Sequence, residues 1–254
     1  GTPTIKNSNS VDLKYVFSVV NDIRKYIKKF KIIITKSTIP VSTGDKIEKM
    51  ISSKVKRKLF EVVSNPEFLR EGEAIRDFKY PDRIIIGTKN KKVIKILANL
   101  YDPIIKKGAI YFTTSRRSAE LIKYASNAFL ATKISFINEL ANLCEKVGIN
   151  TEDIAIGMGL DKRIGSRFLR VGPAYGGSCF PKDTRALINI GEKFKVNLSI
   201  VKSVVNSNDS RRFLLTKRIY EIMSNKLKNK IITFLGVTFK PNTDDMRMSS
   251  SLSM

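Results

Sequence analysis

Hydrophobic positions in the first part of the chain alternate between helical spacing and short β-branched runs. From Val11 to Phe30 apolar side chains recur at the spacing of one helix face, and the apolar run Lys31 to Thr35 follows directly. The first pattern predicts an amphipathic helix, and the second predicts a strand. Similar short runs at 60–64, 83–87 and 109–112 predict three more strands.

The segments between these runs predict helices at 43–52, 71–78 and 91–100. Strands that alternate with helices are typical of a parallel, doubly wound sheet, so the fold class is α/β. Such a domain opens with a strand, a Gly-x-Gly-x-x-Gly turn and a helix, but that spacing occurs nowhere in the sequence. We therefore expect residues 1–114 to be the C-terminal part of a Rossmann-like domain whose glycine-rich half is missing.

The pattern changes after Thr114. Residues 115–146 contain neither Gly nor Pro and keep a helical apolar period, which predicts one long helix with Gly148 as its C-cap. The remaining helices are expected at 151–158, 184–194 and 199–224, around a glycine-rich loop at 165–179. These elements predict an all-helical central domain over residues 115–210. The run Lys230 to Leu235 predicts the first strand of a second α/β domain, truncated, over 211–254.

The charge of the chain is strongly positive, with 47 Lys and Arg against 23 Asp and Glu and a formal net charge of +24. A clustered excess of this kind would favour nucleic acid as a partner. The basic residues are mostly scattered lysines, so we expect no nucleic-acid partner. A basic nucleic-acid binder remains an alternative, and steep salt dependence of binding would reveal it.

The absence of histidine excludes Ser-His-Asp and Cys-His nucleophile pairs and imidazole metal sites. No Cys, Asp and Glu cluster has metal-ligand spacing, so we expect no metal. The two cysteines at unrelated positions favour a reducing cytoplasm. We expect no export leader and no membrane span, because no apolar run is long enough.

One of the two cysteines has the surroundings of a nucleophile. Cys179 follows Gly176 and Gly177 and precedes Lys182 and Asp183. A nearby cation favours thiolate over thiol, which is the reactive form. The alternative is an incidental cysteine, and we assign the other one, Cys144, to the core because it lies in a helical apolar pattern.

Three further segments carry polar residues at places where ligands bind. Residues 37–44 and 64–72 each follow a predicted strand, and in open sheets ligands occupy the crevice at the carboxyl ends of strands. Within 119–129, Lys123 and Asn127 lie four residues apart and share a helix face.

With these motifs, and with 163–174 and 235–247, nearly the whole chain resembles the nucleotide-sugar dehydrogenases of the UDP-glucose/GDP-mannose dehydrogenase family. Phe180 and the Pro-Lys-Asp that follows are more similar to the members that oxidise UDP-glucose than to those acting on GDP-mannose or N-acetylated sugars. The resemblance implies oxidation of the C6 alcohol of UDP-glucose to a carboxylate, with two hydrides passed to NAD. It also implies a homodimer formed through the long central helix.

The resemblance also implies roles for individual residues. Catalytic roles fall on Cys179, Lys123, Asn127, Asp183, Thr38 and Glu67. Substrate binding falls on Phe68, Leu69, Arg70, Arg163, Phe168, Leu169, Arg170, Tyr175, Gly176 and Lys240. Contacts with NAD fall on Thr38, Glu71, Lys182 and Arg247. Arg163 is expected to reach the site of a partner subunit.

Several of these residues also have purely structural interpretations. Lys123 and Asn127 could form a solvated helix face, Asp183 could cap the following helix, and Glu67 could be a first-turn carboxylate favoured by a helix dipole. Tyr175 could be ordinary packing, and Arg70 could be an exposed charge.

Two departures from the family put activity in question. The phosphate-binding glycines are missing, and residues 248–254 replace the Glu-Ser-Pro that usually follows Arg247. An inactive remnant that still dimerises is therefore an alternative; it would bind neither UDP-glucose nor NAD. A dehydrogenase of another nucleotide sugar, GDP-mannose or a UDP-N-acetylhexosamine, is a further alternative.

Overall fold

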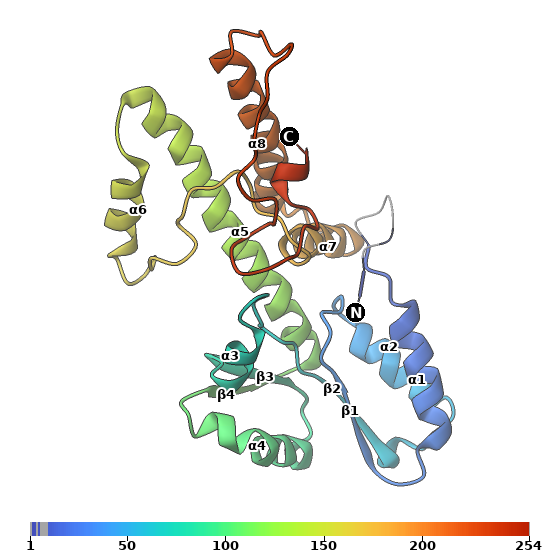
Figure 1. Cartoon of the computed structure of the whole chain (residues 1–254). Helices are drawn as coiled ribbons and strands as arrows, with labels where there is room; N and C mark the ends of the chain where they lie inside the picture. Colours follow the sequence, from blue (N-terminus) through green and yellow to red (C-terminus); the bar gives the residue numbers. More distant parts are fainter. Residues whose placement is uncertain (1, 4, 6–9, 254) are drawn as a thin grey trace. The chain divides into compact units, whose positions relative to one another are not determined.

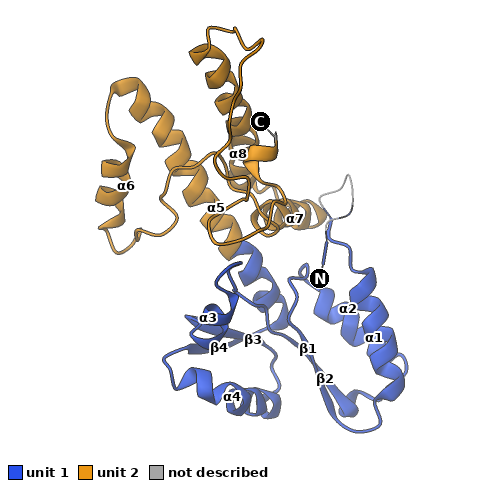
Figure 2. Ribbon diagram, viewed as in Figure 1, with its two compact units in different colours: residues 1–125 blue, residues 126–254 orange. Residues whose placement is uncertain are grey.

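The structure is a computed structural model that describes residues 2, 3, 5 and 10–253 (Figure 1). The chain divides into two compact units, residues 1–125 and 126–254 (Figure 2). Position 254, the end of the segment that departs from the family pattern, lies outside the described residues, as do 1, 4 and 6–9.

Unit 1 is built on a four-stranded sheet in the order β1-β2-β3-β4. Its strands are β1 (Lys31–Thr35), β2 (Phe60–Ser64), β3 (Arg83–Gly87) and β4 (Ile110–Thr114). The first three have the predicted bounds, and the fourth begins and ends slightly later than predicted. The pairs β1–β2 and β3–β4 are parallel, as predicted.

The two parallel pairs are joined by an antiparallel contact that the sequence did not predict. β2 pairs with β3 through Ser64 and Gly87, the last residue of each strand. The link between them, residues 65–82, contains α3 (Ala74–Lys79). The carboxyl ends of both parallel pairs meet at this contact. A buried apolar run has the same pattern in either direction, so the sequence does not reveal this reversal.

Four helices accompany the strands of unit 1: α1 (Lys14–Tyr26), α2 (Thr43–Ser52), α3 and α4 (Lys91–Ile105). A short 3-10 turn, η1 (Arg57–Leu59), precedes β2. In Figure 1, α1 and α2 lie beside β1 and β2. One apolar cluster joins α1 and α2 to these strands through Val20, Ile33, Ile47 and Val62, and a second joins α4 to β3.

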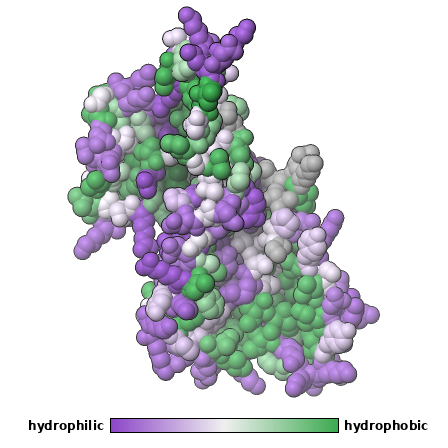
Figure 3. Space-filling view, in the orientation of Figure 1, coloured by the Kyte–Doolittle hydropathy of each residue, from purple (hydrophilic) through white to green (hydrophobic). Residues whose placement is uncertain are grey.

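The edge strand β1 keeps part of its apolar surface accessible. Its central Ile33 is buried, while Ile32 and Ile34 are only partly buried. Figure 3 shows apolar surface over the region of unit 1 that holds β1 and β2. Strands of parallel pairs are apolar on both faces, which explains why a short sheet leaves such surface uncovered.

Unit 2 is helical, as predicted. The long helix α5 (Arg116–Val147) begins in unit 1 and continues into unit 2, where α6 (Thr151–Gly159), α7 (Phe180–Lys193) and α8 (Ser199–Ile222) follow. Gly148 has a φ of 71° just after α5, which fits its predicted role as a C-cap. The core of this unit includes Ala131, Tyr175 and Val204.

The start of α7 and the segment 230–235 differ most from the sequence prediction in unit 2. Helix α7 begins at Phe180 instead of Thr184, because Pro181 fits the first helical turn, where its missing N–H is no loss. Residues 230–235 are not a strand, because a strand needs a hydrogen-bonded neighbour and these residues pair with none among those described. The chain ends in the 3-10 turn η2 (Ser250–Ser253).

Gly87, the last residue of β3, packs so closely against α5 that the position has no room for a side chain. A Cβ at this position would lie 2.6 Å from the Ala119 Cβ and 2.9 Å from the Arg116 Cα. Gly87→Ala should therefore lower the free energy of unfolding by about 1–3 kcal/mol through overpacking. Gly157→Ala is the matched control, because nothing lies within 4 Å of its added Cβ inside α6. Urea unfolding should show it to be stabilising by about 0.5–1 kcal/mol, and equal effects for both variants would contradict this packing.

Candidate active site

Cys179 is placed at the start of a helix and is accessible. It is the N-cap residue of α7, its side chain is exposed, and its sulfur lies 3.7 Å from the Ser178 hydroxyl oxygen. The amino end of a helix stabilises negative charge, so this position suits a sulfur nucleophile. Cys144 is buried in α5, as predicted.

Asp183 lies in the first turn of the same helix and is 1% exposed. Its carboxylate accepts hydrogen bonds from Asn127 Nδ2 at 2.6 Å and from Lys182 Nζ at 2.5 Å. The side chain does not cap the helix, because Cys179 is the N-cap residue and no side-chain cap bond is made. Asp183 therefore anchors Asn127 and Lys182 beneath the cysteine turn.

The glycines before the cysteine are required by close packing. Gly177 has a φ of 77°, and its N–H donates to the Arg247 carbonyl at 3.1 Å. A Cβ on Gly176 would collide with the Met248 carbonyl oxygen, and one on Gly177 would lie 2.6 Å from the Phe239 ring. Within unit 2, the segment 239–248 therefore lies directly against the cysteine loop.

Tyr175 and Phe180 surround the cysteine loop with aromatic groups. Their ring centroids are 6.1 Å apart with an edge-on geometry, and the backbone of Tyr175 is bonded on both sides by Asn208. Burial raises the pKa of the Tyr175 hydroxyl, and the neighbouring Thr184 hydroxyl opposes that rise. Tyr175 is therefore a packed residue of the cysteine loop, in keeping with its 5% exposure.

The other predicted substrate residues of unit 2 differ in burial and in contacts. Phe168 packs near Phe180 with centroids 6.1 Å apart and has a φ of 66°, while Leu169 is buried and Arg170 is exposed. Arg163 is 89% exposed at its side chain and pairs with Asp161.

Lys240 and Arg247 both lie in the segment 239–248. The Lys240 ammonium lies 5.5 Å from the centre of the Phe239 ring. Arg247 forms two 2.8 Å bonds to the Asp245 carboxylate. The contacts of Gly176 and Gly177 therefore place both cations on a segment that packs against the cysteine loop.

In unit 1, Lys123 and Glu67 lie together. Lys123 is 4% exposed, its Nζ is 3.8 Å from Glu67 Oε1, and it lies 5.1 Å from the centre of the Phe68 ring. Asn127, one helical turn further, is 6% exposed, so neither residue lies on a solvated helix face. Glu67 accepts from the Leu69 N–H at 2.6 Å and precedes α3 by several residues, so it is no first-turn carboxylate.

Thr38 lines a small cavity in unit 1 at the carboxyl ends of β1 and β2. The cavity walls include Ser37, Thr38, Ser64, Lys123 and Glu120. Thr38 is itself 9% exposed, and its carbonyl accepts a hydrogen bond from the Thr2 hydroxyl at 2.8 Å. The structure thus brings Thr38 and Lys123, predicted from separate motifs, to one cavity.

Arg70 is engaged within unit 1, and Glu71 beside it is partly buried. The Arg70 guanidinium donates two bonds, of 2.9 and 2.6 Å, to the Asp77 carboxylate. These bonds hold the pKa of Asp77 below its ordinary value of 3.8. An anionic ligand at Arg70 would compete with Asp77 for the guanidinium.

The ion pair of Arg70 and Asp77 predicts how the free energy of unfolding depends on pH. A lowered carboxyl pKa adds stability that is present above the unfolded-state pKa and is lost as pH falls through the folded-state pKa. Asp77→Asn should therefore lower the free energy of unfolding near neutral pH by less than about 1 kcal/mol, because Arg70 is half-exposed. The difference from wild type should shrink near pH 3 in urea unfolding. A difference that stays constant with pH would show that the ion pair contributes nothing.

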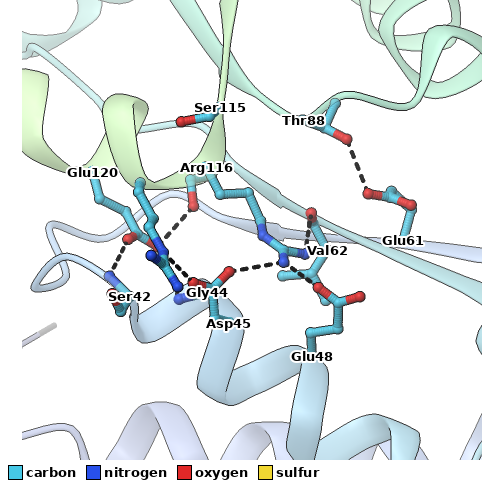
Figure 4. Close-up of polar contacts among 12 residues, drawn as sticks. Ser42, Gly44, Asp45, Glu48, Glu61, Val62, Thr88, Ser115, Arg116 and Glu120 are labelled. Atoms are coloured by element: carbon cyan, nitrogen blue, oxygen red, sulfur yellow. Dashed lines mark hydrogen bonds and ion pairs between the residues drawn. The ribbon is translucent and has the colours of Figure 1, made fainter.

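The segment 119–129 also contains a buried carboxylate to which the sequence analysis assigned no role. Glu120 is 3% exposed and accepts hydrogen bonds from the backbone N–H groups of Ser42 and Gly44 (Figure 4). It also accepts one from the Ser64 hydroxyl. Burial raises its pKa, and these hydrogen bonds oppose that rise. Its donors are distant in sequence, so no local pattern identifies them.

Two family models match the chain. Residues 1–105 match the NAD binding domain of the UDP-glucose/GDP-mannose dehydrogenase family, and residues 117–210 match the central domain of the same family. Together the two matches cover most of the sequence. The chain belongs to the UDP-glucose/GDP-mannose dehydrogenase family.

Curated relatives support this assignment. The chain is 46% identical to the UDP-glucose 6-dehydrogenase of Rhizobium meliloti over 257 residues, covering all of this chain and 59% of the relative. It is 47% identical to that of Rickettsia felis over 254 residues, covering all of this chain and 56% of the relative. The chain therefore spans less than two thirds of the length of these relatives.

A solved structure agrees with the fold. The UDP-glucose dehydrogenase of Pyrobaculum islandicum superimposes with a TM-score of 0.91 at 36% identity, covering all of this chain and 58% of the other. GDP-mannose dehydrogenase of Pseudomonas aeruginosa gives a TM-score of 0.60 at 30% identity, covering all of this chain and 58% of the other. The mixed α/β unit and the helical central unit are thereby confirmed. None of the helices in the described part of the chain is long and apolar enough to cross a membrane.

Proposed function

We propose that this chain is part of an enzyme that oxidises the C6 alcohol of UDP-glucose to the carboxylate of UDP-glucuronate in two steps. The observation that carries the proposal is the exposed Cys179 at the start of α7, above a buried Asp183 that binds Asn127 and Lys182. An accessible thiol beside a fixed acid–amide–ammonium group suits capture of an aldehyde.

In this proposal the Cys179 sulfur adds to the C6 aldehyde formed by the first oxidation, giving a thiohemiacetal. Loss of the second hydride leaves a thioester on Cys179, and water hydrolyses it to release the carboxylate and the thiol. The amide of Asn127 and the ammonium of Lys123 stabilise negative charge on the C6 oxygen. Thr38 holds the water by a hydrogen bond, and the carboxylate of Asp183 or Glu67 accepts its proton.

We infer that NAD is the oxidant, because residues 1–105 match the NAD binding domain of the family. Ser37, Thr38 and Ser64 lie at the carboxyl ends of β1 and β2, the edge where open α/β sheets bind dinucleotides. When bound, NAD supplies the chemistry by accepting one hydride in each oxidation. Thr38 and Glu71 in unit 1, and Lys182 and Arg247 in unit 2, are the proposed NAD contacts.

The remaining substrate assignments rest on the resemblance of the motifs. Phe68, Leu69 and Arg70 follow β2, and the unit 2 residues are Arg163, Phe168, Leu169, Arg170, Tyr175, Gly176 and Lys240. The aromatic rings beside the cysteine loop and the exposed guanidinium groups of Arg163 and Arg170 suit a nucleoside diphosphate. In this proposal Arg163 serves the site of a partner subunit.

We also propose that the protein is a homodimer through α5. Three exposed apolar side chains, Phe129, Phe136 and Leu143, recur at seven-residue spacing along this helix. A stripe of this period favours pairing with a second helix. Sedimentation of the chain should give the mass of a dimer.

The test is NADH formation by the purified chain with UDP-glucose and NAD, counted per sugar consumed, with GDP-mannose and a UDP-N-acetylhexosamine as comparison substrates. The proposal expects two NADH for each UDP-glucose, since the oxidation removes four electrons. NADH from only another nucleotide sugar would overturn the substrate assignment. A dimer that binds neither UDP-glucose nor NAD would favour the inactive remnant.

A further inference from the structure

We propose that Glu120 is a positioning residue that holds the Thr38 loop, residues 37–44, against the turn of α5 that carries Lys123. The inference rests on the proposed function, in which Thr38 and Lys123 serve the same reaction. Glu120 itself need not touch the substrate.

The contacts of Glu120 join three parts of unit 1 that are separate in sequence. Oε2 accepts from Ser42 N at 2.7 Å, and Oε1 accepts from Gly44 N at 2.8 Å and from Ser64 Oγ at 3.1 Å. Ser42 and Gly44 lie at the start of α2, and Ser64 ends β2. One carboxylate on α5 therefore fixes both the loop after β1 and the end of β2.

The loop is shaped to receive this carboxylate. Ser42 has a φ of 73°, a left-handed conformation that is unfavourable for serine and persists only where the surroundings enforce it. A Cβ on Gly44 would lie 2.8 Å from Glu120 Oε1 and 3.3 Å from Ser64 Oγ. Both features let backbone N–H groups approach the carboxylate directly.

The contacts of Glu120 also fix the position of Lys123, because both residues lie on α5. Residues three apart on a helix lie on one face, and Glu120 and Lys123 line the same cavity as Thr38. Arg116, one turn earlier, pairs with Asp45 at 2.8 Å and with Glu48, which fixes the same face of α5 to α2 (Figure 4). Rotation of α5 about its axis would break these bonds, so the position of Lys123 depends on them.

A carboxylate is needed because all three of its partners donate hydrogen bonds. Glutamine has the same shape, but its amide nitrogen cannot accept, so one backbone N–H would face another donor in a buried site. Glu120→Gln therefore tests the anchor with little change in volume. Glu61→Gln is the matched control: Glu61 is 7% exposed in the same unit, and its partners Arg57, Thr88 and Asn90 do not line the cavity.

The experiment measures how fast the Lys123 amine in the folded chain is acetylated by an N-hydroxysuccinimide ester, read by peptide mass spectrometry. Labelling of a buried amine follows local opening, so Glu120→Gln should raise the Lys123 rate about tenfold. Glu61→Gln should lower the urea midpoint while leaving the Lys123 rate within about twofold of wild type. Equal Lys123 rates in the two variants would overturn the inference, because a merely stabilising carboxylate has no reason to act on Lys123.

Two further readouts keep the inference separate from the proposed function. If the wild-type chain forms NADH, Glu120→Gln should lower kcat about tenfold with KM for UDP-glucose within about twofold. If the wild-type chain forms none, the proposed function fails but the labelling still decides the role of Glu120. Should Glu120→Gln not fold, Ser64→Ala removes one of the three donors and should raise the Lys123 rate about threefold; an unchanged rate overturns the anchor.

Discussion

Replacing Cys179 with serine should slow steady-state turnover of UDP-glucose to UDP-glucuronate by about a thousandfold or more, while the affinity for UDP-glucose stays within about twofold. Serine keeps the shape of the N-cap position, but its hydroxyl is a far weaker nucleophile than a thiol. The thioester cannot form, so the second oxidation has no covalent intermediate to act on. Stopped assays would give the NADH yield, and isothermal titration would give the affinity.

The control is Cys144→Ala, which removes the other thiol. Cys144 is 3% exposed in the interior of unit 2, so this variant should lose some stability and keep its NADH yield. Wild-type turnover by Cys179→Ser would refute the covalent route. Loss of turnover in both variants would indicate that stability, and not the thiol, limits the assay.

The second large effect is expected at Asp183. Asp183→Ala should lower the free energy of unfolding by about 3 kcal/mol, because it leaves the ammonium of Lys182 and the amide of Asn127 without their acceptor. Asn127 is 6% exposed and the Lys182 side chain 18% exposed, so water replaces the lost bonds poorly. Urea unfolding followed by circular dichroism measures this directly.

Asp209→Asn is the matched control for Asp183. Asp209 pairs with Arg185 at 2.7 Å, but its side chain is 43% exposed. Its replacement should change the free energy of unfolding by less than about 1 kcal/mol. A similar loss at both positions would mean that burial of the Asp183 group contributes little.

The sequence predicted most of the fold because each element of unit 1 carries its own local signal. The β-branched runs of β1, β2 and β3 and the helical period of α2 gave their bounds directly. Strand direction was not predictable in the same way, since a buried run has the same pattern in either orientation. The antiparallel contact of Ser64 with Gly87 therefore appears only in the structure.

The candidate site was predicted in part. The spacing of Lys123 and Asn127 placed them on one helix face, and the structure buries both. The sequence alone could not show that Asn127 contacts Asp183 or that Lys123 contacts Glu67, because these partners come from distant segments. Glu120 shows the same limit: two of its three bonds are to backbone N–H groups, which any residue type can supply.

The packing of segment 239–248 on Gly176 and Gly177 has a consequence for biosynthesis. A chain is made from its amino end, and domains fold as units as they emerge from the ribosome. The cysteine loop is translated well before Phe239 and Arg247, which supply its glycine contacts. Until those residues emerge, the nascent chain holds its only exposed thiol on a loop that lacks its final cover. If translation stalled in this interval, the molecules would contain a folded α5 but a cysteine loop without the contacts of Phe239 and Arg247.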